Sequence, residues 1–207
     1  MGAAITTKSA SLYADSPSNV AVKSSFFSLK YLSISPLFYE IGSGKGEFMT
    51  DYALKHKDSH FLAVERAQTI AGIMAKRLQD NGVENVRVFP YDGEIVFDQT
   101  PENSVDGIFL NFVDPWPKKK HAKRRLTYHV FLEQYYRMLK HGGCVYFKSD
   151  NDSLFEFTLE EIPLTKFKLV MSEEDYQFDE ENDAMTGYEA KFRGLGQKIH
   201  RIVLKKE

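Results

Sequence analysis

The chain has 207 residues and a formal net charge of −2 at pH 7, with 43% hydrophobic and 27% charged residues. This length fits one domain with a substantial core, and the composition is that of a globular protein rather than of a disordered chain. The single cysteine, Cys144, excludes an internal disulfide, and no stretch approaches the ~18 apolar residues of a transmembrane helix. We therefore expect a cytoplasmic protein without a membrane partner.

Residues 1–36 are expected to form a loosely ordered arm ahead of a single domain over residues 37–207. The opening MGAAIT fits the pattern of N-myristoylation, but a single acyl chain needs a second signal for stable membrane binding. The Ser-rich composition resembles that of a transit peptide, but the segment contains no arginine. We therefore interpret it as an arm.

From residue 37, short apolar runs alternate with stretches of helical periodicity. The runs predict strands near 37–42, 60–65, 86–91, 105–112, 144–150, 167–171 and 198–206. Helices are expected near 47–57, 70–80, 127–140 and 154–162, and His141-Gly142-Gly143 is expected to end the third of them. This order predicts an α/β, Rossmann-like fold: a mostly parallel seven-stranded sheet with helices on both faces and a terminal antiparallel strand.

In such a sheet, ligands bind beyond the carboxyl ends of the strands. An acidic residue stands at that end of each of the first five predicted strands. These residues are Glu40, Glu65, Asp92, Asp114 and Asp150. A lone acid at such a position more often caps a helix or faces solvent, so their significance depends on the loop that accompanies them.

That loop is EIGSGKGEF (40–48), in which Gly42 and Gly44 allow the backbone to turn tightly and to approach a ligand. The dinucleotide fingerprint G-x-G-x-x-G would require a glycine where this chain has Glu47. A carboxylate at the start of a helix is also poorly placed to receive a pyrophosphate. The loop therefore disfavours NAD.

S-adenosylmethionine fits the loop better, because it has no phosphate and carries an ammonium and a sulfonium group. Glu40 flanks the loop with negative charge, Glu65 is placed for the ribose hydroxyls, and Asp92 could accept from the adenine amino group. The loop and these three acids together predict a methyltransferase-type cofactor site. We predict no metal site.

The fourth strand is followed by Asp114-Pro115-Trp116-Pro117. The two prolines restrict their own φ angles and those of the preceding residues, so the turn should be stiff. A stiff turn at a strand end holds a carboxylate in place, which favours Asp114 as a catalytic residue. Trp116 could stack on a base or pack beneath the loop.

A basic segment comes next, in which six of eight residues are Lys or Arg. Such a run by itself is often a solvated face or a localisation signal. At the rim of a predicted active site it favours a polyanionic substrate, above all RNA, gripped through its phosphates. The residues are Lys118, Lys119, Lys120, Lys123, Arg124 and Arg125.

The turn partly matches the DPPY-type turn of amino-group methyltransferases, with Trp116 where a second proline would stand. The chain resembles the bacterial tRNA (guanine-N7)-methyltransferases far more closely, over roughly residues 38–204. The matching strings are EIGSGKGEF, AVE, YD, NFVDPWPKKKHAKRRLTY, FKSDN and TGYEAKFRGLGQKIHR. One departure is the arm, which is usually basic and Arg-containing in that family.

The resemblance implies a class I S-adenosylmethionine-dependent methyltransferase fold and a tRNA substrate, modified at guanosine 46 of the variable loop. It implies that Asp114 is the catalytic acid. It assigns cofactor contacts to Glu40, Glu65, Asp92 and Asp114, and guanosine contacts to Lys118, Asp150, Thr186, Gly187, Tyr188 and Glu189. No obligatory protein partner is expected, and a monomer and a homodimer both fit.

Guanine N7 carries a lone pair and no proton, so catalysis should rest on positioning and on a carboxylate that stabilises the developing positive charge. Asp150 or Glu189 could accept hydrogen bonds from the guanine N1 and N2 edge and so select guanine. The acidic stretch 173–183 is expected to be a mobile, solvated connection. Two alternatives stay open: an enzyme that methylates an exocyclic amine of RNA, and a non-catalytic RNA-binding protein with the same fold.

Overall fold

The computed structural model describes residues 35–207, so the expected arm lies outside the described residues apart from Ser35 and Pro36. Within this part of the chain, seven strands form one sheet in the order β3-β2-β1-β4-β5-β7-β6. β1 to β5 are parallel, and β7 runs antiparallel to both of its neighbours. The predicted fold class is therefore confirmed. The strands are β1 (Leu37–Ile41), β2 (His60–Val64), β3 (Val86–Phe89), β4 (Val105–Asn111), β5 (Leu139–Ser149), β6 (Lys168–Glu173) and β7 (His200–Lys205).

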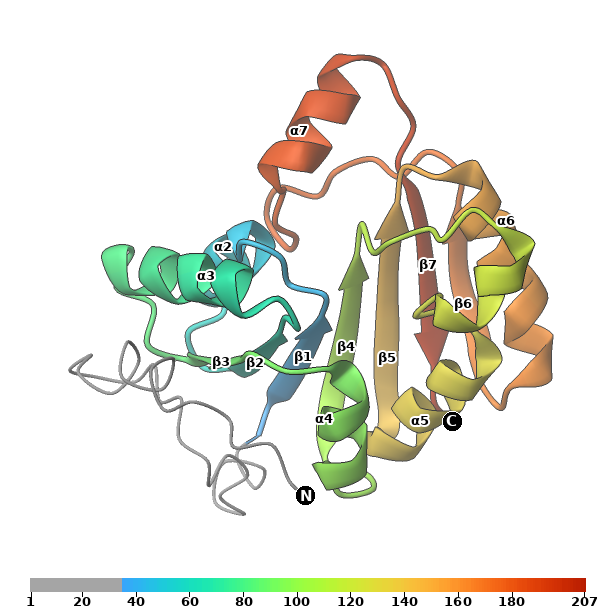
Figure 1. Ribbon diagram of the computed structural model, residues 1–207, viewed down its shortest axis with the longest axis horizontal. Coiled ribbons are helices and arrows are strands. Elements are labelled where there is room, and N and C mark those ends of the chain that lie inside the picture. Colours follow the sequence, from blue (N-terminus) through green and yellow to red (C-terminus); the bar gives the residue numbers. More distant parts are fainter. Residues whose placement is uncertain (1–34) are drawn as a thin grey trace, which may run out of the picture.

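Helices cover both faces of this sheet (Figure 1). α2 and α3 pack on one face and α4, α5 and α6 on the other, while α7 stands beyond the carboxyl ends of the central strands. No helix among residues 35–207 is both long enough and apolar enough to cross a membrane. The helices are α2 (Glu47–Lys55), α3 (Gln68–Asp80), α4 (Gly93–Gln99), α5 (His129–Met138), α6 (Asp152–Glu161) and α7 (Gly187–Gly194), with short 3₁₀ helices η2 (Lys119–Arg124) and η3 (Ile162–Leu164).

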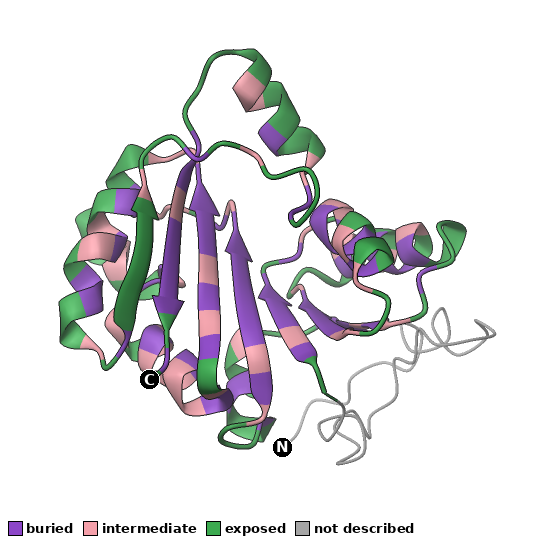
Figure 2. Ribbon diagram, turned by 180° about the vertical axis from the view of Figure 1, so that it is seen from behind, coloured by how far each residue is buried: buried purple, intermediate pink, exposed green. Residues whose placement is uncertain are grey.

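Two apolar clusters hold these layers together, one on each face of the sheet. Successive side chains of a strand point to opposite faces of the sheet and so enter different clusters. In β2, Leu62 and Val64 join the cluster beneath α4 to α6, whereas Phe61 and Ala63 join the cluster beneath α2 and α3. Figure 2 shows the central strands buried along most of their length and β6, at the sheet edge, exposed. The core therefore fixes the central strands whose ends form the site.

Two features of the secondary structure differ from the expectations. α4, η2 and α7 are absent from the predicted elements, because they are short and carry weak apolar periodicity. His141-Gly142-Gly143 does not end the third predicted helix; α5 passes directly into β5 at Leu139, which pairs with Val105. Gly142 N donates to Lys206 O at 2.8 Å, so this glycine pair lies inside the sheet.

The acidic stretch 173–183 is also better anchored than expected. Tyr176 and Asp183 are buried, and Tyr176 N donates to Ile199 O at 2.7 Å. Lys55, at the end of α2, donates from Nζ to the carbonyl oxygens of Glu180 and Asp183 at 2.6 and 2.7 Å. The prediction of a solvated connection is therefore wrong at these residues, although most of the other acids in the stretch are exposed.

Candidate active site at the carboxyl ends of the strands

Two adjoining cavities open at the carboxyl ends of the strands. Cavity A has a volume of about 680 Å³ and cavity B of about 560 Å³, and both are lined by the glycine loop and by the segment after β4. Glu65 and Asp92 line cavity A, Glu40 and Asp150 line cavity B, and Asp114 lines both. The structure thus brings together all five acids that the sequence places at strand ends.

The glycine loop between β1 and α2 requires glycine at several positions. Gly42, Gly44 and Gly46 have φ angles of 80°, 54° and 74°, in the left-handed region that other residues rarely adopt. A Cβ on Gly46 would lie 2.5 Å from Met74 Cγ, so the loop also needs a glycine for its close approach to α3. This backbone gives Gly42 and Gly44 a place in the walls of both cavities.

Glu40 is a buried carboxylate with unused hydrogen-bonding capacity. Only 2% of it is exposed; Oε1 accepts from Asn111 Nδ2 at 3.0 Å, and Oε2 has no partner within residues 35–207. Burial raises the pKa of Glu40 to about 7, partly offset by the Asn111 hydrogen bond. Asn111 Oδ1 is also buried and unpartnered within this range. Two unsatisfied buried acceptors beside a cavity fit a cationic donor such as an ammonium group.

Glu65 and Asp92 combine backbone capping with a place in cavity A. Glu65 accepts from Gly44 N at 3.1 Å and from Ala67 N at 2.8 Å, which ties the glycine loop to the end of β2. Asp92 caps α4 by accepting from Glu94 N at 3.2 Å. Each carboxylate oxygen has two lone pairs, so these contacts leave both acids able to accept hydrogen bonds from a ligand.

The turn after β4 presents Asp114 to solvent at the junction of the two cavities. Phe112 and Trp116, on either side of it, have φ angles of 51° and 42°, which are unfavourable for residues with a Cβ. Such backbone strain persists only where neighbouring groups hold it in place. On one side of the turn, Phe112 N donates to Lys148 O at 2.9 Å. On the other side, the Arg125 side chain donates to the carbonyl oxygens of Pro115 and Trp116.

Arg125 holds the turn rather than facing solvent. Its Nε donates to Pro115 O at 3.0 Å and its Nη2 to Trp116 O at 3.1 Å, while the guanidinium stacks 4.2 Å from the centre of the Phe157 ring. The side chain is buried. This differs from the expected position at the surface, since two of its donors bond to the turn; its contact with the RNA backbone stays a prediction.

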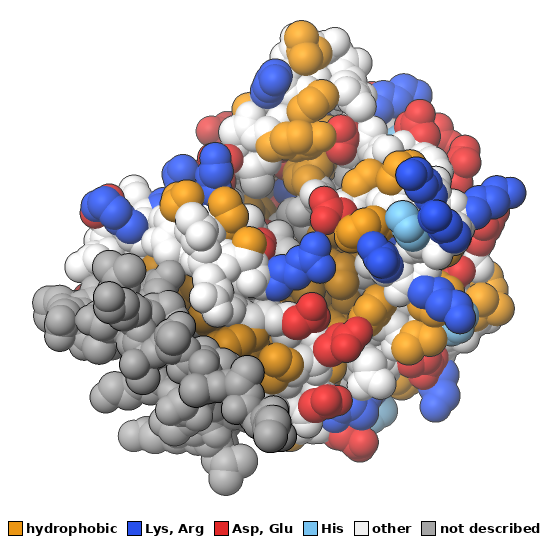
Figure 3. All heavy atoms as spheres, in the orientation of Figure 1, with side chains coloured by type: hydrophobic (Ala, Val, Ile, Leu, Met, Phe, Trp, Pro, Cys, Tyr) orange, Lys and Arg blue, Asp and Glu red, His pale blue; other side chains and the backbone are white. Residues whose placement is uncertain are grey.

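The rest of the basic segment lies on the surface beside cavity A. Figure 3 shows Lys and Arg side chains with a histidine gathered next to the central hollow, over the segment that follows β4. Arg124 packs over the half-buried Trp116 ring at 5.0 Å, and both residues line cavity A. The exposed residues are Lys118, Lys119, Lys120, Lys123 and Arg124. Their exposure matches the predicted contact with phosphates, which stays a prediction.

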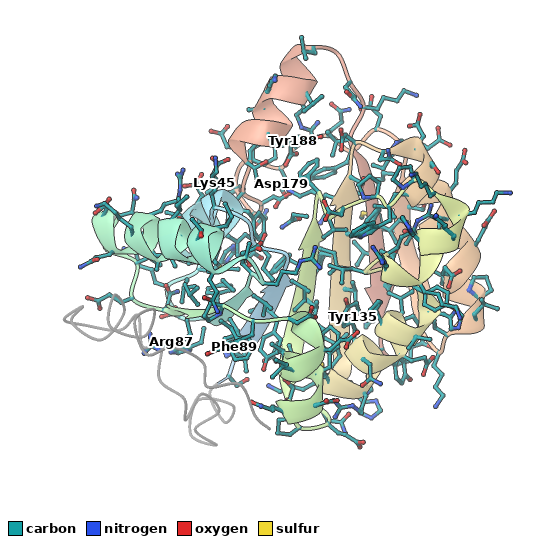
Figure 4. The ribbon with its side chains drawn as sticks, in the orientation of Figure 1. Lys45, Arg87, Phe89, Tyr135, Asp179 and Tyr188 are labelled. Atoms are coloured by element: carbon teal, nitrogen blue, oxygen red, sulfur yellow. The ribbon has the colours of Figure 1, made fainter. Side chains whose placement is uncertain are left out.

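The wall of cavity B opposite the glycine loop comes from the start of α7. Tyr188 donates from its hydroxyl to Asp150 Oδ2 at 2.8 Å, and desolvation together with Asp150 raises the pKa of Tyr188 to about 12. Thr186 caps α7 by accepting from Glu189 N at 2.9 Å. In Figure 4, Tyr188 lies at the foot of α7 and Lys45 lies beside the start of α2, both above the ends of the central strands.

Glu189 does not face either cavity. It is fully buried, with Oε2 accepting from Lys148 Nζ at 3.1 Å and Oε1 from Arg193 Nη2 at 2.8 Å. Both oxygens are therefore engaged within the protein, which differs from the expected place of Glu189 in the site; its contact with guanine stays a prediction. The spacing of Glu189 and Arg193, one helical turn apart, could have indicated this ion pair. Sequence reasoning also missed Asn111, the partner of Glu40.

Comparisons with known proteins agree with this architecture. The model of a family described as "Putative methyltransferase" matches residues 34–202. A tRNA (guanine-N(7)-)-methyltransferase from Mesoplasma florum is 40% identical over 181 residues, covering 83% of this chain and 81% of the relative. The enzyme of the same name from an Exiguobacterium species is 40% identical over 168 residues, covering 81% and 78%. A solved structure, titled as that of an antibiotic-related methyltransferase, shares the fold, with a TM-score of 0.61, 16% identity and coverage of 84% and 90%.

Proposed function

Because the chain belongs to the family of tRNA (guanine-N7)-methyltransferases, we propose that it transfers a methyl group from S-adenosylmethionine to N7 of a guanosine in tRNA. The observation that carries this proposal is the place of Asp114, at the junction of two cavities that four further strand-end acids line. The target is guanosine 46 of the variable loop, and the proposed compartment is the cytoplasm.

The residues of the site suit S-adenosylmethionine, which supplies a methyl group activated by a sulfonium. Glu40 and Asn111 offer buried acceptors for its ammonium group. Glu65 offers its carboxylate to the ribose hydroxyls, and Asp92 offers its own to the adenine amino group. Gly42 and Gly44 leave room for the ligand to approach the backbone.

Asp114 stabilises charge rather than moving a proton. Methylation at N7 turns guanine into a cation, and N7 carries no proton that a base would have to remove. A carboxylate held in place by the turn and by Arg125 favours that positive charge as it develops, without reorganising at the moment of reaction. Catalysis otherwise rests on aligning the reacting atoms.

Guanine is recognised from the side of α7. Asp150 receives one hydrogen bond from Tyr188 and retains acceptor capacity for the N1 and N2 edge of the base. Tyr188 and Thr186 line the same cavity, whereas Glu189 supports α7 from behind. Adenine lacks donors at the corresponding positions, so an acceptor here selects guanine.

The exposed basic segment grips the phosphates of the tRNA that delivers the base. Lys118 lies next to Pro117 and so closest in sequence to Asp114, and Lys123 and Arg124 line the rim of cavity A. The target base leaves its stack to enter the site. The basic residues thus supply the affinity for tRNA, while the acidic residues bind the cofactor and the base and stabilise the reaction.

The test is methyl transfer from isotopically labelled S-adenosylmethionine into unmodified tRNA transcripts, followed by nuclease digestion and mass spectrometry of the nucleosides. We expect labelled 7-methylguanosine, lost when guanosine 46 is replaced by adenosine. Labelled N2-methylguanosine or N6-methyladenosine would support an exocyclic-amine enzyme instead. Tight tRNA binding without label transfer would support a non-catalytic RNA-binding protein.

A further inference from the structure

Glu47 joins two parts of the chain that line different sides of the site. It is the first residue of α2, where the dinucleotide fingerprint would have glycine. Its Oε2 accepts from the backbone N of Gly187, the first residue of α7, at 2.7 Å and across 140 residues of sequence. Its Oε1 lies 3.5 Å from Arg77 Nη2 of α3. The first turns of α2 and α7 are therefore tied directly to each other.

Each end of this hydrogen bond carries residues of the proposed ligand sites. Gly42 and Gly44, in the loop before Glu47, line both cavities, and Glu47 itself lines cavity B. Thr186 and Tyr188 flank Gly187 and line cavity B. A Cβ on Gly187 would lie 3.1 Å from Glu47 Oε2, so a larger residue there would push the Glu47 carboxylate aside by a few tenths of an ångström.

The far side of α7 is fixed to the sheet by buried charges. Lys148 of β5 donates to Glu189 Oε2 at 3.1 Å, to Asp183 Oδ2 at 3.0 Å and to Ala184 O at 3.1 Å. Arg193 completes the cluster by donating to Glu189 Oε1. α7 is therefore bonded to β5, which ends one residue before Asp150, and the Glu47–Gly187 hydrogen bond links α7 to the residue that follows the glycine loop.

We propose that Glu47 is a positioning residue that couples the binding of the cofactor to the binding of tRNA. A cofactor that orders the glycine loop fixes the Glu47 carboxylate, which in turn holds the start of α7 and Tyr188 in place to receive the base. Because coupling between two sites is reciprocal, a base bound against Tyr188 raises the affinity for the cofactor by the same factor. This inference rests on the proposed function, because it concerns the same two ligands.

Three variants distinguish this coupling role from a role of Glu47 in the local structure of α2 alone. Glu47→Ala removes the acceptor for Gly187 N. Glu47→Gln keeps an amide oxygen that accepts the same hydrogen bond, so it should restore most of the coupling. Arg77→Gln removes the 3.5 Å ion pair but leaves the contact with Gly187, and so it serves as the matched control.

The experiment measures the Kd of S-adenosylhomocysteine by calorimetry, with and without saturating unmodified tRNA transcript. The ratio of the two values is the coupling factor. We expect tRNA to tighten binding about fivefold or more in the wild type and in Arg77→Gln, a range typical of coupled sites. In Glu47→Ala the factor should fall towards 1, while the Kd of S-adenosylhomocysteine without tRNA changes less than about twofold; Glu47→Gln should lie near the wild type.

Hydrogen exchange of the ligand-free proteins gives a second readout. Amides at the start of α7 should exchange faster in Glu47→Ala than in the wild type, with no change in Arg77→Gln. The inference would be overturned by an equal coupling factor in the wild type and in Glu47→Ala, or by a wild-type factor of 1. The proposed function would still be supported in both cases if the protein transferred methyl groups into tRNA. Failure of the wild type to bind tRNA at all would overturn both.

Discussion

The guanidinium of Arg125 donates a hydrogen bond to the carbonyl oxygen of Trp116, 3.1 Å away, and a second one to Pro115 O. Arg125 belongs by sequence to the basic segment, yet it serves the turn that bears Asp114. The segment is thus divided: its last residue holds the turn that bears Asp114, and Lys118, Lys119, Lys120, Lys123 and Arg124 face solvent. The basic residues lie next to Asp114 because the proposed substrate is a base attached to a polyanion.

The first prediction concerns Arg125→Lys. A lysine ammonium cannot reproduce the planar fork that bridges two carbonyl oxygens, so Asp114 should lose its fixed position. We expect kcat to fall roughly tenfold while the KM for tRNA stays within about twofold. Trp116 is the only tryptophan, so a shift in its fluorescence should accompany the loss. A raised KM with an unchanged kcat would instead mark Arg125 as a phosphate contact.

The second prediction concerns the exposed lysines. Lys119→Ala and Lys120→Ala should raise the KM for tRNA and leave kcat nearly unchanged, because we propose that these residues contact phosphates. Each should reduce the slope of log Kd against log salt by about 1, as expected for one lost phosphate contact. Lys168→Ala, on the exposed edge strand, is the control and should change neither value. An unaltered salt slope in the two variants would remove the basic segment from the tRNA interface.

The third prediction concerns Glu40 and pH. Its pKa is raised to about 7 in the folded protein, from an ordinary value near 4.5. Between these values the unfolded chain releases a proton that the folded protein retains, so this group lowers the stability of the free protein as pH rises through that window. Glu40→Gln, which never ionises, should be more stable than the wild type at pH 8, by up to about 3 kcal/mol, with the gap closing at pH 5.

Urea unfolding at the two pH values measures this difference, with Glu156→Gln, an exposed acid on α6, as the control. The same Glu40→Gln variant should bind S-adenosylhomocysteine at least tenfold more weakly at pH 8, since it lacks the negative charge for the ammonium group. A variant that is stabilised but binds normally would remove Glu40 from the cofactor site.

The fourth prediction concerns the buried cluster behind α7. Glu189→Ala leaves Lys148 buried without one of its acidic partners, which typically costs about 3–5 kcal/mol of stability. Because both oxygens of Glu189 are engaged inside the protein, the folded variant should keep the wild-type preference for guanine over adenine. Denaturant unfolding and the nucleoside products test the two halves. Methylation of an adenosine at the target position would show that Glu189 reads the base.

The layout of the fold could be predicted from the sequence because it depends on strong local signals. Apolar runs such as 105–112 mark buried strands, and the shared edge at which parallel strands end is enough to place Glu40 and Asp114 near each other. The same signals did not reveal α7, because it is short and has weak apolar periodicity. Its start carries a local cap, in which Thr186 accepts from Glu189 N, and the hydrogen bond from Gly187 N to Glu47 adds a contact that periodicity cannot indicate.

The site residues divide in the same way. Strand position sufficed for Glu65 and Asp92, which line cavity A as expected. It did not reveal the internal partners of Arg125 and Glu189, because whether a charged side chain faces solvent or an internal partner depends on tertiary contacts. The sequence near each residue is equally polar in the two cases.

The most direct test of the account is the single-turnover rate of 7-methylguanosine formation by the wild type and by Asp114→Asn, at saturating S-adenosylmethionine and tRNA. The asparagine keeps the size of the side chain but removes the charge that favours the cationic product. We predict a loss on the order of 10²-fold in rate, with tRNA binding retained. A rate equal to that of the wild type would contradict the role of Asp114 and with it the mechanism proposed for this site.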